Sequence, residues 1–341
     1  MRRGSTALPA ALAALVVSTA LSAAVAELAR IEVILAEKRR AAALALAACD
    51  ACVAEVLAAI PAGWDFGPLL AGPDGRIGTG DDGALAVPAG CTGSAGAAPG
   101  PANPPRALLH LEARAGGGRR ALEALVGRAP APGIPALVWL GAAPGANVSG
   151  TVTLDGADAD DPSAPDWSGL VAADDPEALD RWLADEGARV VSSARTQAAL
   201  ASPPPPLAAL AARVRAAGPR GGEALGTADA PPPSLAFVQG DLVVSDGRRG
   251  AGLLFVDGLL DIRGALDFTG LVIAAGGVRV AGAGRLAIRG ALWVGAPPAG
   301  GPLLDVAGSL ALSQQRAAMA TADGLLTLPR RPVLLGVRDL G

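Results

Sequence analysis

The sequence is poor in the side chains that most enzymes use for chemistry. Its 341 residues include one histidine, His110, and no tyrosine, and aromatic residues make up only 3%. A single histidine excludes zinc sites built from several imidazoles and weakens any hypothesis of a His-dependent catalytic triad. The sequence also lacks a nucleophile elbow, a phosphate-binding loop and a metalloprotease motif. We therefore expect no enzymatic activity.

Charged residues are also few, at 18%, and Lys38 is the only lysine. The net charge of −4 leaves no basic excess, so we expect no nucleic-acid partner. Apolar residues, at 51%, are numerous enough to form a core. The 46 glycines and 29 prolines predict long irregular stretches around it.

The amino terminus carries an apolar run that is long enough to cross a membrane. Arg2 and Arg3 precede residues 7–26, which carry no charge and consist mainly of alanine, leucine and valine. Twenty helical residues span roughly 30 Å, the thickness of the hydrocarbon core of a bilayer. The positive-inside rule then keeps the amino end in the cytoplasm and the remainder outside. The alternative is a secretory signal peptide that is cleaved among the small residues at 22–26.

The apolar run continues into a second helical pattern. Residues 27–60 contain no glycine or proline, and their apolar positions recur with a helical period between charged ones. Pro61 and Gly63 then end the pattern. The whole predicts one helix of about fifty residues, roughly 75 Å long. A cleaved signal peptide has no reason to continue into such a helix, so an anchor is favoured.

The first sixty residues resemble a known family. Arg3 and Gly4 precede a small residue and the apolar run, Glu-Leu-Ala-Arg-Ile-Glu follows at 27–32, and Arg39 begins an alanine-rich stretch. This order resembles the start of PilX-type pilus assembly proteins, the minor-pilin-like components of type IV pili. The resemblance implies that a prepilin peptidase cuts between Gly4 and Ser5, with methylation of the new amino terminus.

The same resemblance implies an inner-membrane anchor and other pilins or pilus assembly proteins as partners. The sequence departs from the broader pilin pattern at two positions. The fifth mature residue is Pro9, where major pilins carry glutamate, and the first is Ser5 instead of phenylalanine or methionine.

Two acidic loops are candidates for cation binding. Asp74, Asp81 and Asp82 lie among glycines in the connection over 62–105, and calcium prefers several such oxygen ligands. The spacing does not match an EF-hand, and Asp-Gly turns explain the same residues. The aspartates at 155–161 allow the same two interpretations. We expect solvated turns in both loops, with calcium as the weaker hypothesis and no other cofactor.

The middle of the chain predicts a hairpin followed by a helical insertion. Residues 107–112 and 121–128 flank the glycines at 116–118, which favours a β hairpin; a helix over 119–128 is the alternative. This stretch also resembles the hairpin that follows the helix in PilX-type proteins. Short strands are expected at 136–140 and 148–154. Beyond these strands, helices are expected at 175–186, 194–201 and 207–217.

A repeat between 235 and 312 predicts a parallel β-helix. Six-residue units such as 253–258, 259–264 and 265–270 each end in glycine, and three of them make a period of 18 to 20 residues. A sheet of antiparallel hairpins is the alternative. The alternation predicts two sets of side chains: Leu254, Val256, Leu260, Ile262, Leu266 and Phe268 point inward, whereas Asp257, Asp261, Arg263, Asp267 and Thr269 point outward.

The ends of the repeat are also assigned. Residues 148–154 are expected to add an earlier rung, and 303–312 the last rung. A short helix over 314–322 is expected to shield the edge of that last rung.

The three cysteines allow a disulfide. Cys49 and Cys52 lie three residues apart on the long helix, and Cys91 lies in the following loop. If this segment is exported, a disulfide from Cys91 to one of them is plausible, with Cys52 as the expected partner. Free buried thiols are the alternative. Nothing completes a zinc or haem motif.

Together these patterns predict an α+β protein with a long amino-terminal helix and a short carboxyl-terminal β-solenoid. The expected divisions are 1–61, 62–105, 106–155, 156–236, 237–322 and a tail over 323–341. The resemblance implies a structural, minor-pilin-like role in type IV pilus assembly. The alternatives are a membrane-tethered, polymer-forming solenoid similar to bactofilins, and an anchored polysaccharide-binding protein.

Overall fold

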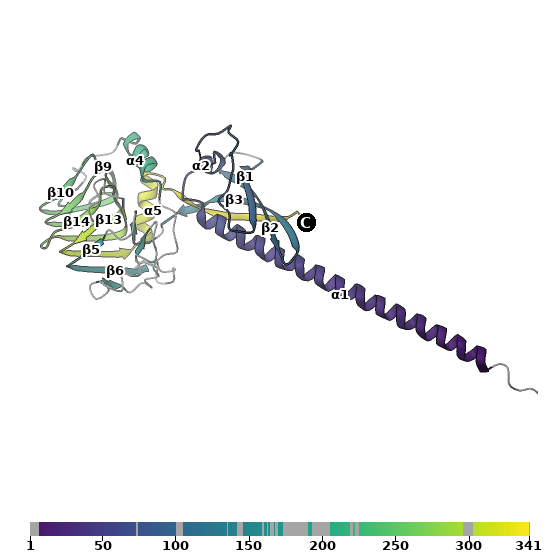
Figure 1. The fold of residues 1–341 in the computed structure, drawn as a ribbon. Helices are drawn as coiled ribbons and strands as arrows, with labels where there is room; N and C mark the ends of the chain where they lie inside the picture. The colour runs from purple at the N-terminus through teal and green to yellow at the C-terminus, as the bar shows by residue number, and fades with distance from the viewer. Residues whose placement is uncertain are drawn as a thin grey trace, which may run out of the picture.

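The computed structural model describes residues 7–340 with the exception of 73, 100–104, 135, 142–145, 159, 162, 164–166, 168–169, 173–189, 193–204, 219–220, 222–224 and 296–302. It has the expected α+β architecture, with a long amino-terminal helix, a small antiparallel sheet and a β-solenoid. The helix projects from the sheet, and the solenoid lies on the far side of the sheet from the exposed end of the helix (Figure 1).

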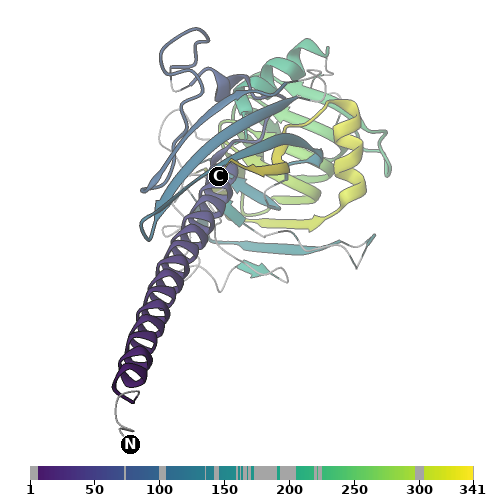
Figure 2. The same ribbon diagram turned by 90° about the vertical axis from the view of Figure 1, so that its right-hand side faces the viewer.

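Helix α1 (Ala7–Ala59) is one unbroken helix of 53 residues, about 80 Å long. Its amino-terminal half extends away from the rest of the chain (Figure 2). Its carboxyl-terminal half packs on the antiparallel sheet through a stripe of buried residues with helical spacing: Ala45, Cys49, Cys52, Val53, Val56 and Ile60. The amphipathic period expected from residue 27 therefore becomes a buried face only from Ala45 onward.

The antiparallel sheet has the order β1-β2-β3-β18. Strands β2 (Arg106–Ala115) and β3 (Gly118–Pro132) form the expected hairpin, and β1 (Cys91–Ala97) pairs with β2. Gly116 and Gly117 both have positive φ in the turn. The alternative of a helix over 119–128 is wrong, because alternate residues of β3 face α1. The short helix α2 (Gly67–Leu70) follows α1.

Strand β18 (Arg330–Asp339) occupies the stretch that we expected to be a tail. It pairs antiparallel with β3 over eight residue pairs, with two register shifts. The chain therefore leaves the sheet after β3, builds the whole solenoid, and returns to the same sheet. Residues 133–329 are in effect an insertion between two neighbouring strands of the sheet.

The solenoid has three faces. The first is a five-stranded parallel sheet, in the order β10 (Leu242–Val244), β12 (Leu260–Ile262), β14 (Val278–Val280), β16 (Leu304–Val306) and β5 (Ala146–Val148). The other two faces share the long strands β11 (Gly247–Val256), β13 (Ala265–Ala274) and β15 (Arg285–Val294). These pair in parallel, which rules out the antiparallel alternative.

A column of glycines forms the bend in the long strands. Gly252 pairs with Gly270 and Gly270 with Gly290, so successive coils differ by 18 and 20 residues, as predicted. All three have positive φ, and a Cβ on Gly270 or Gly290 would overlap the carbonyl oxygen of the glycine one coil away. The corner therefore requires glycine at each level.

The remaining strands complete the second and third faces. The second face continues sideways from the first half of β15. Its further strands, each paired with the one before, are β17 (Ser309–Gln314), β6 (Thr151–Asp158) and β8 (Val190–Ser192). On the third face, β9 (Ser234–Val238) pairs with the second half of β11. There β4 (Val138–Leu140) pairs with β15 and with β7 (Leu170–Ala172).

The coil order differs from the expected one. Residues 148–154 do contribute a rung, but it lies beyond the last coil, because β5 pairs with β16 and β6 pairs with β17. The chain thus builds one end of the solenoid first, crosses to the other end, and winds back. Since β6 covers the edge of β17, helix α5 (Arg316–Leu325) is not needed there. It packs instead along the side of the solenoid, against β11, β13 and β15.

The solenoid contains two cores. The six residues expected to point inward are all buried in the first, inside the coils. Among the residues expected to point outward, Asp261 is an exception, since it is only 4% exposed and its Oδ2 accepts hydrogen bonds from Arg263. The second core lies outside the third face, where Leu253, Phe255 and Trp293 pack beneath α5 and α4 (Leu207–Ala216).

The expected helix over 207–217 is thus present as α4. The expected helices over 175–186 and 194–201 lie outside the described residues.

Candidate functional site

The exposed half of α1 is apolar on every side. Leucine and valine side chains from Leu8 to Leu28 are 56–73% exposed and occupy consecutive positions as well as helically spaced ones. In the described part of the chain, this is the one helix that is long and apolar enough to cross a membrane. A helix that is apolar all round requires an apolar environment. The expected processing residues Gly4 and Ser5 lie outside the described residues.

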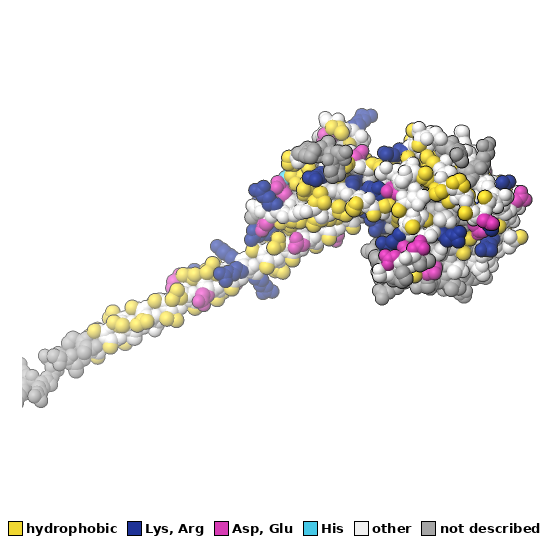
Figure 3. All heavy atoms as spheres, turned by 180° about the vertical axis from the view of Figure 1, so that it is seen from behind, with side chains coloured by type: hydrophobic (Ala, Val, Ile, Leu, Met, Phe, Trp, Pro, Cys, Tyr) yellow, Lys and Arg dark blue, Asp and Glu magenta, His cyan; other side chains and the backbone are white. Residues whose placement is uncertain are grey.

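A charged, exposed segment separates the apolar run from the sheet. Residues 27–40 carry the charged side chains of α1 that lie between the apolar run and the sheet, including the pair Glu27–Arg30. Figure 3 shows these side chains as a cluster along the projecting helix, between apolar stretches. From residue 26 to Ala45 the helix rises roughly 28 Å. The sheet is therefore held well clear of the apolar run.

The hairpin turn contacts α1 directly. A Cβ on Gly116 would come within 2.7 Å of Leu44 Cδ1, and one on Gly118 would overlap the carbonyl oxygen of Ala41. The glycines thus let the tip of the hairpin lie against the helix backbone.

A disulfide joins Cys52 of α1 to Cys91 at the start of β1, with 6.5 Å between their Cα atoms. It ties the end of the connection after α1 back to the helix. Cys49 is free and buried, and its thiol donates a hydrogen bond to the carbonyl oxygen of Arg120 at 3.2 Å. Burial raises the pKa of the Cys49 thiol. A buried thiol with a raised pKa is poorly suited to redox exchange.

Arg128 holds the junction between α1, the sheet and β18. Its guanidinium donates to the carbonyl oxygens of Pro61 at 2.8 Å, of Arg330 at 3.2 Å and of Asp65, and it lies 4.1 Å from the centre of the Phe66 ring. Desolvation by burial lowers the pKa of Arg128 to about 10. The side chain stays charged at neutral pH and fixes three chain segments at once.

We expect Arg128→Met to lower the free energy of unfolding of the sheet by about 3 kcal/mol, because it removes three hydrogen bonds from a charged donor at about 1 kcal/mol each. Hydrogen exchange of the β2 and β3 amides measures this. Arg114→Met on the neighbouring strand is the control, since Arg114 is 73% exposed. Equal exchange in the two variants would contradict the assigned role.

A second contact lies between the sheet and the solenoid. The Trp64 indole donates to the carbonyl oxygen of Thr327 at 2.8 Å, and the Arg213 guanidinium of α4 lies 4.4 Å from the centre of the Trp64 ring. The segment that follows α1 is therefore packed against α4 and against the chain that leaves α5.

The candidate calcium loop is built from turns. Asp81 accepts hydrogen bonds from the Asp74 amide and the Thr79 hydroxyl, and Asp82 accepts from the Gly78 amide at 2.7 Å. The Thr79 hydroxyl lowers the pKa of Asp81. Within the described residues, no three His, Cys, Asp or Glu side chains converge as metal ligands would. Calcium binding stays a prediction.

In the second acidic loop, Asp158 is buried and accepts hydrogen bonds from the amides of Asp160 and Arg316. This carboxylate therefore serves to join the loop to the start of α5.

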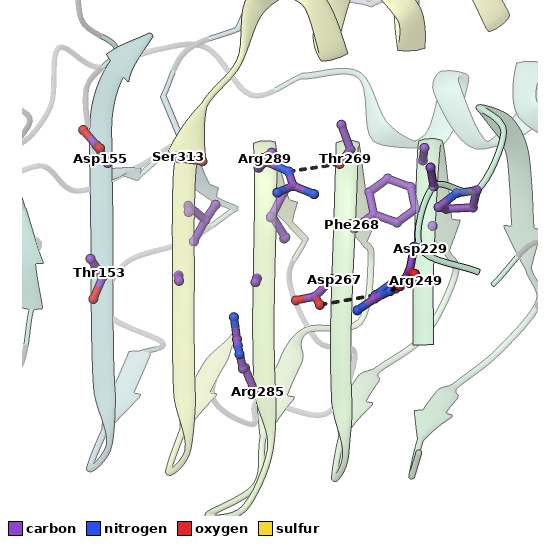
Figure 4. Close-up of a pocket in the computed structure, with 18 residues that line it drawn as sticks. Thr153, Asp155, Asp229, Arg249, Asp267, Phe268, Thr269, Arg285, Arg289 and Ser313 are labelled. Carbon is purple, nitrogen blue, oxygen red and sulfur yellow. Dashed lines mark hydrogen bonds and ion pairs between the residues drawn. The ribbon is translucent and has the colours of Figure 1, made fainter. Parts of the chain in front are cut away.

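A hollow lies on the outer side of the second solenoid face. It is a groove of 710 Å³ that crosses strands β6, β17, β15, β13 and β11. Arg285 and Arg289 of β15 line it, with Thr269 and Asp267 on β13 and Asp155 at the far end (Figure 4). Arg249 at the other end is paired with Asp229, and its Nε lies 3.8 Å from Asp267 Oδ2.

Two features that the sequence analysis missed do have a signal in the sequence: the pair of arginines in the groove, and the strands of the third solenoid face that are buried on both sides. Arg285 and Arg289 lie four residues apart on an alternating strand, which places them on one face. The runs Leu-Leu-Phe-Val at 253–256 and Leu-Val-Ile-Ala at 271–274 do not alternate, which is typical of strands buried on both faces. His110, by contrast, is partly exposed beside Glu123 and lies in neither feature.

No protein-family model and no curated protein matches the sequence. A comparison with solved structures finds a similarity to the competence-associated pilin ComZ from Thermus thermophilus. The two chains are 11% identical, the match covers 76% of this chain and 84% of the other, and the TM-score is 0.26. A likeness this weak does not by itself assign a function to the present chain.

Proposed function

We propose that this protein is a structural, non-enzymatic component of type IV pilus assembly, similar to the PilX-type minor pilins. The observation that carries the proposal is the division of α1. One half is apolar on all sides and exposed, and the other half packs on a disulfide-pinned antiparallel sheet. Such a helix has one half available to a bilayer or to neighbouring helices, while the other presents a folded head.

The charge pattern supports a specific orientation. Arg2 and Arg3 precede the apolar run, so the amino end lies in the cytoplasm and the sheet and solenoid lie outside the inner membrane. The disulfide Cys52–Cys91 suits that oxidising side. The charged segment over 27–40 then stands at the membrane surface or among neighbouring pilin helices.

Processing of the leader tests the proposal. The full chain is expressed together with a prepilin peptidase, and the mass of its amino-terminal peptide is measured from purified membranes. We expect a methylated start at Ser5, and an unprocessed start at Met1 for Gly4→Leu. An intact Met1 in the unmodified chain would contradict pilin-type processing. A start near Glu27 would instead identify a cleaved secretory signal and exclude the anchor.

A further inference from the structure

The groove on the second solenoid face has a defined shape. Its floor is formed by Ala287 and Ala311, which are neighbours on β15 and β17 and whose side chains are too short to fill the surface. Arg285 and Arg289 stand on either side of Ala287 along β15, because alternate residues of a strand share a face. The result is a shallow, flat-floored hollow between two arginines.

One end of the groove is closed by chain. Gly226 pairs with Arg249 through two backbone hydrogen bonds of 2.8 and 2.9 Å, so the segment that follows it, including Asp229 and Pro231, forms a wall beside β11. The volume of the groove, 710 Å³, lies within the usual range of roughly 300–1,000 Å³ for small-ligand sites. The groove therefore suits a short molecule or the end of a longer one.

The two central arginines are not neutralised. Among the described residues, the guanidinium of Arg285 has no ion pair or hydrogen bond, and that of Arg289 donates only to the Thr269 hydroxyl, at 3.3 Å. A guanidinium stays charged and presents a planar set of donors that fits a carboxylate. Both are exposed in the groove, so they are free to bind acidic groups of a ligand.

The other lining groups narrow the class of ligand. The groove combines hydroxyl groups from Thr153, Thr269 and Ser313 with carboxylates from Asp155 and Asp267. Sugar hydroxyls both donate and accept hydrogen bonds, so they can use carboxylates and donors together. The only aromatic residue of the lining, Phe268, is 3% exposed and offers no platform for stacking bases.

We propose that this groove binds a short acidic oligosaccharide, with Arg285 and Arg289 holding the carboxylates of uronic acid residues. The floor of Ala287 and Ala311 accommodates the flat apolar side of a sugar ring. The groove lies on the solenoid, at the opposite end of the molecule from the exposed half of α1 (Figure 1), so it remains accessible when that helix is embedded.

Calorimetry on the full chain in detergent tests this with tetragalacturonate, its methyl ester, hyaluronate and alginate oligomers, and a single-stranded DNA. We expect binding to at least one of the uronate oligomers and none to the methyl ester. Arg285→Gln and Arg289→Gln should each weaken binding at least tenfold, because each removes a charge-assisted contact. Ala287→Leu, which fills the floor of the groove without changing its charge, should abolish binding of the uronate oligomers.

Matched controls remove one positive charge elsewhere. Arg279→Gln lies on the first solenoid face beside Asp305, and Arg338→Gln is 78% exposed on β18. Both should bind as the unmodified chain does. Absence of binding to every uronate, equal weakening in the controls, or tighter binding of the DNA would overturn the proposal. None of these results bears on leader processing, so the two proposals fail separately.

Discussion

Removal of β18 is expected to unfold the antiparallel sheet while leaving the solenoid intact. A chain that ends at Pro329 loses eight residue pairs with β3 and the Arg330 carbonyl that Arg128 binds. At about 0.5 kcal/mol for each of these contacts, the lower end of the range for a hydrogen bond, we expect a loss of roughly 5 kcal/mol in the free energy of opening of the sheet. The freed edge of β3 would also promote aggregation.

Hydrogen exchange measures this loss residue by residue. The amides of β2 and β3 should exchange more than a thousandfold faster, whereas those of β13 and β15 should keep their protection. A chain that ends at Asp339 is the control, since among the described backbone hydrogen bonds it loses the one from the Leu340 amide to the Ala121 carbonyl. Unchanged protection of β3 in the shorter chain would show that the sheet is stable without its last strand.

The same truncation should free the solenoid from the helix. In the intact chain, two crossings join the sheet to the solenoid, one after β3 and one before β18. Without β18, only the first covalent crossing and the Trp64 contacts with Thr327 and Arg213 are left, and we expect limited proteolysis between Pro132 and Val138 to separate the two parts. The solenoid fragment should remain folded because its two cores do not depend on β18.

Local patterns predicted the parts of this fold that local physics determines. The absence of glycine and proline over residues 10–60, together with a helical period, predicts α1, and the Gly116–Gly118 cluster predicts the hairpin. The glycine at every sixth position predicts the solenoid, since corners such as Gly270 leave no room for a Cβ. In each case neighbouring residues carry the information.

The features that sequence reasoning missed depend on distant contacts. Strand β18 pairs with β3, about two hundred residues earlier, and nothing near Arg330 indicates that partner. The position of β6 beside β17 was missed for the same reason. The many residues between these two strands leave no local sign of their register in the sequence. The burial of Asp261 depends on its contacts within the first solenoid face. The alternation of the sequence alone predicts an exposed position for this residue.

The candidate groove was missed for a related reason. Arg285 and Arg289 could be placed on one face from their spacing, but the hollow between them exists only because Ala287 and Ala311 meet across two coils. That pairing joins residues 24 positions apart, a longer step than the 18 to 20 of the other coils. The register of the last coil was therefore not predictable from the repeat.

The disulfide is expected to make its largest contribution to the stability of strands β1 and β2 of the sheet. It closes a loop of 39 residues, and loop-closure entropy of a chain of that length corresponds to about 4 kcal/mol. Beyond Ile60 this loop is rich in glycine and proline, and Phe66 and Ala71 are its buried apolar residues among those described, so few other contacts replace the cross-link. We expect Cys91→Ser to lower the free energy of opening of β1 and β2 by about that amount.

Cys91→Ser is preferable to a change at Cys52, because Cys91 is half-buried, whereas Cys52 belongs to the buried face of α1 in the core against the sheet. Hydrogen exchange of the β1 and β2 amides is measured with and without reductant. Reductant should destabilise the unmodified chain to the level of Cys91→Ser and leave the variant unchanged. Cys49→Ala, one helical turn away, removes a buried thiol without breaking a cross-link and should cost about 1 kcal/mol. If reductant leaves the unmodified chain as protected as before, packing on α1 alone holds β1, and the cross-link has no structural role.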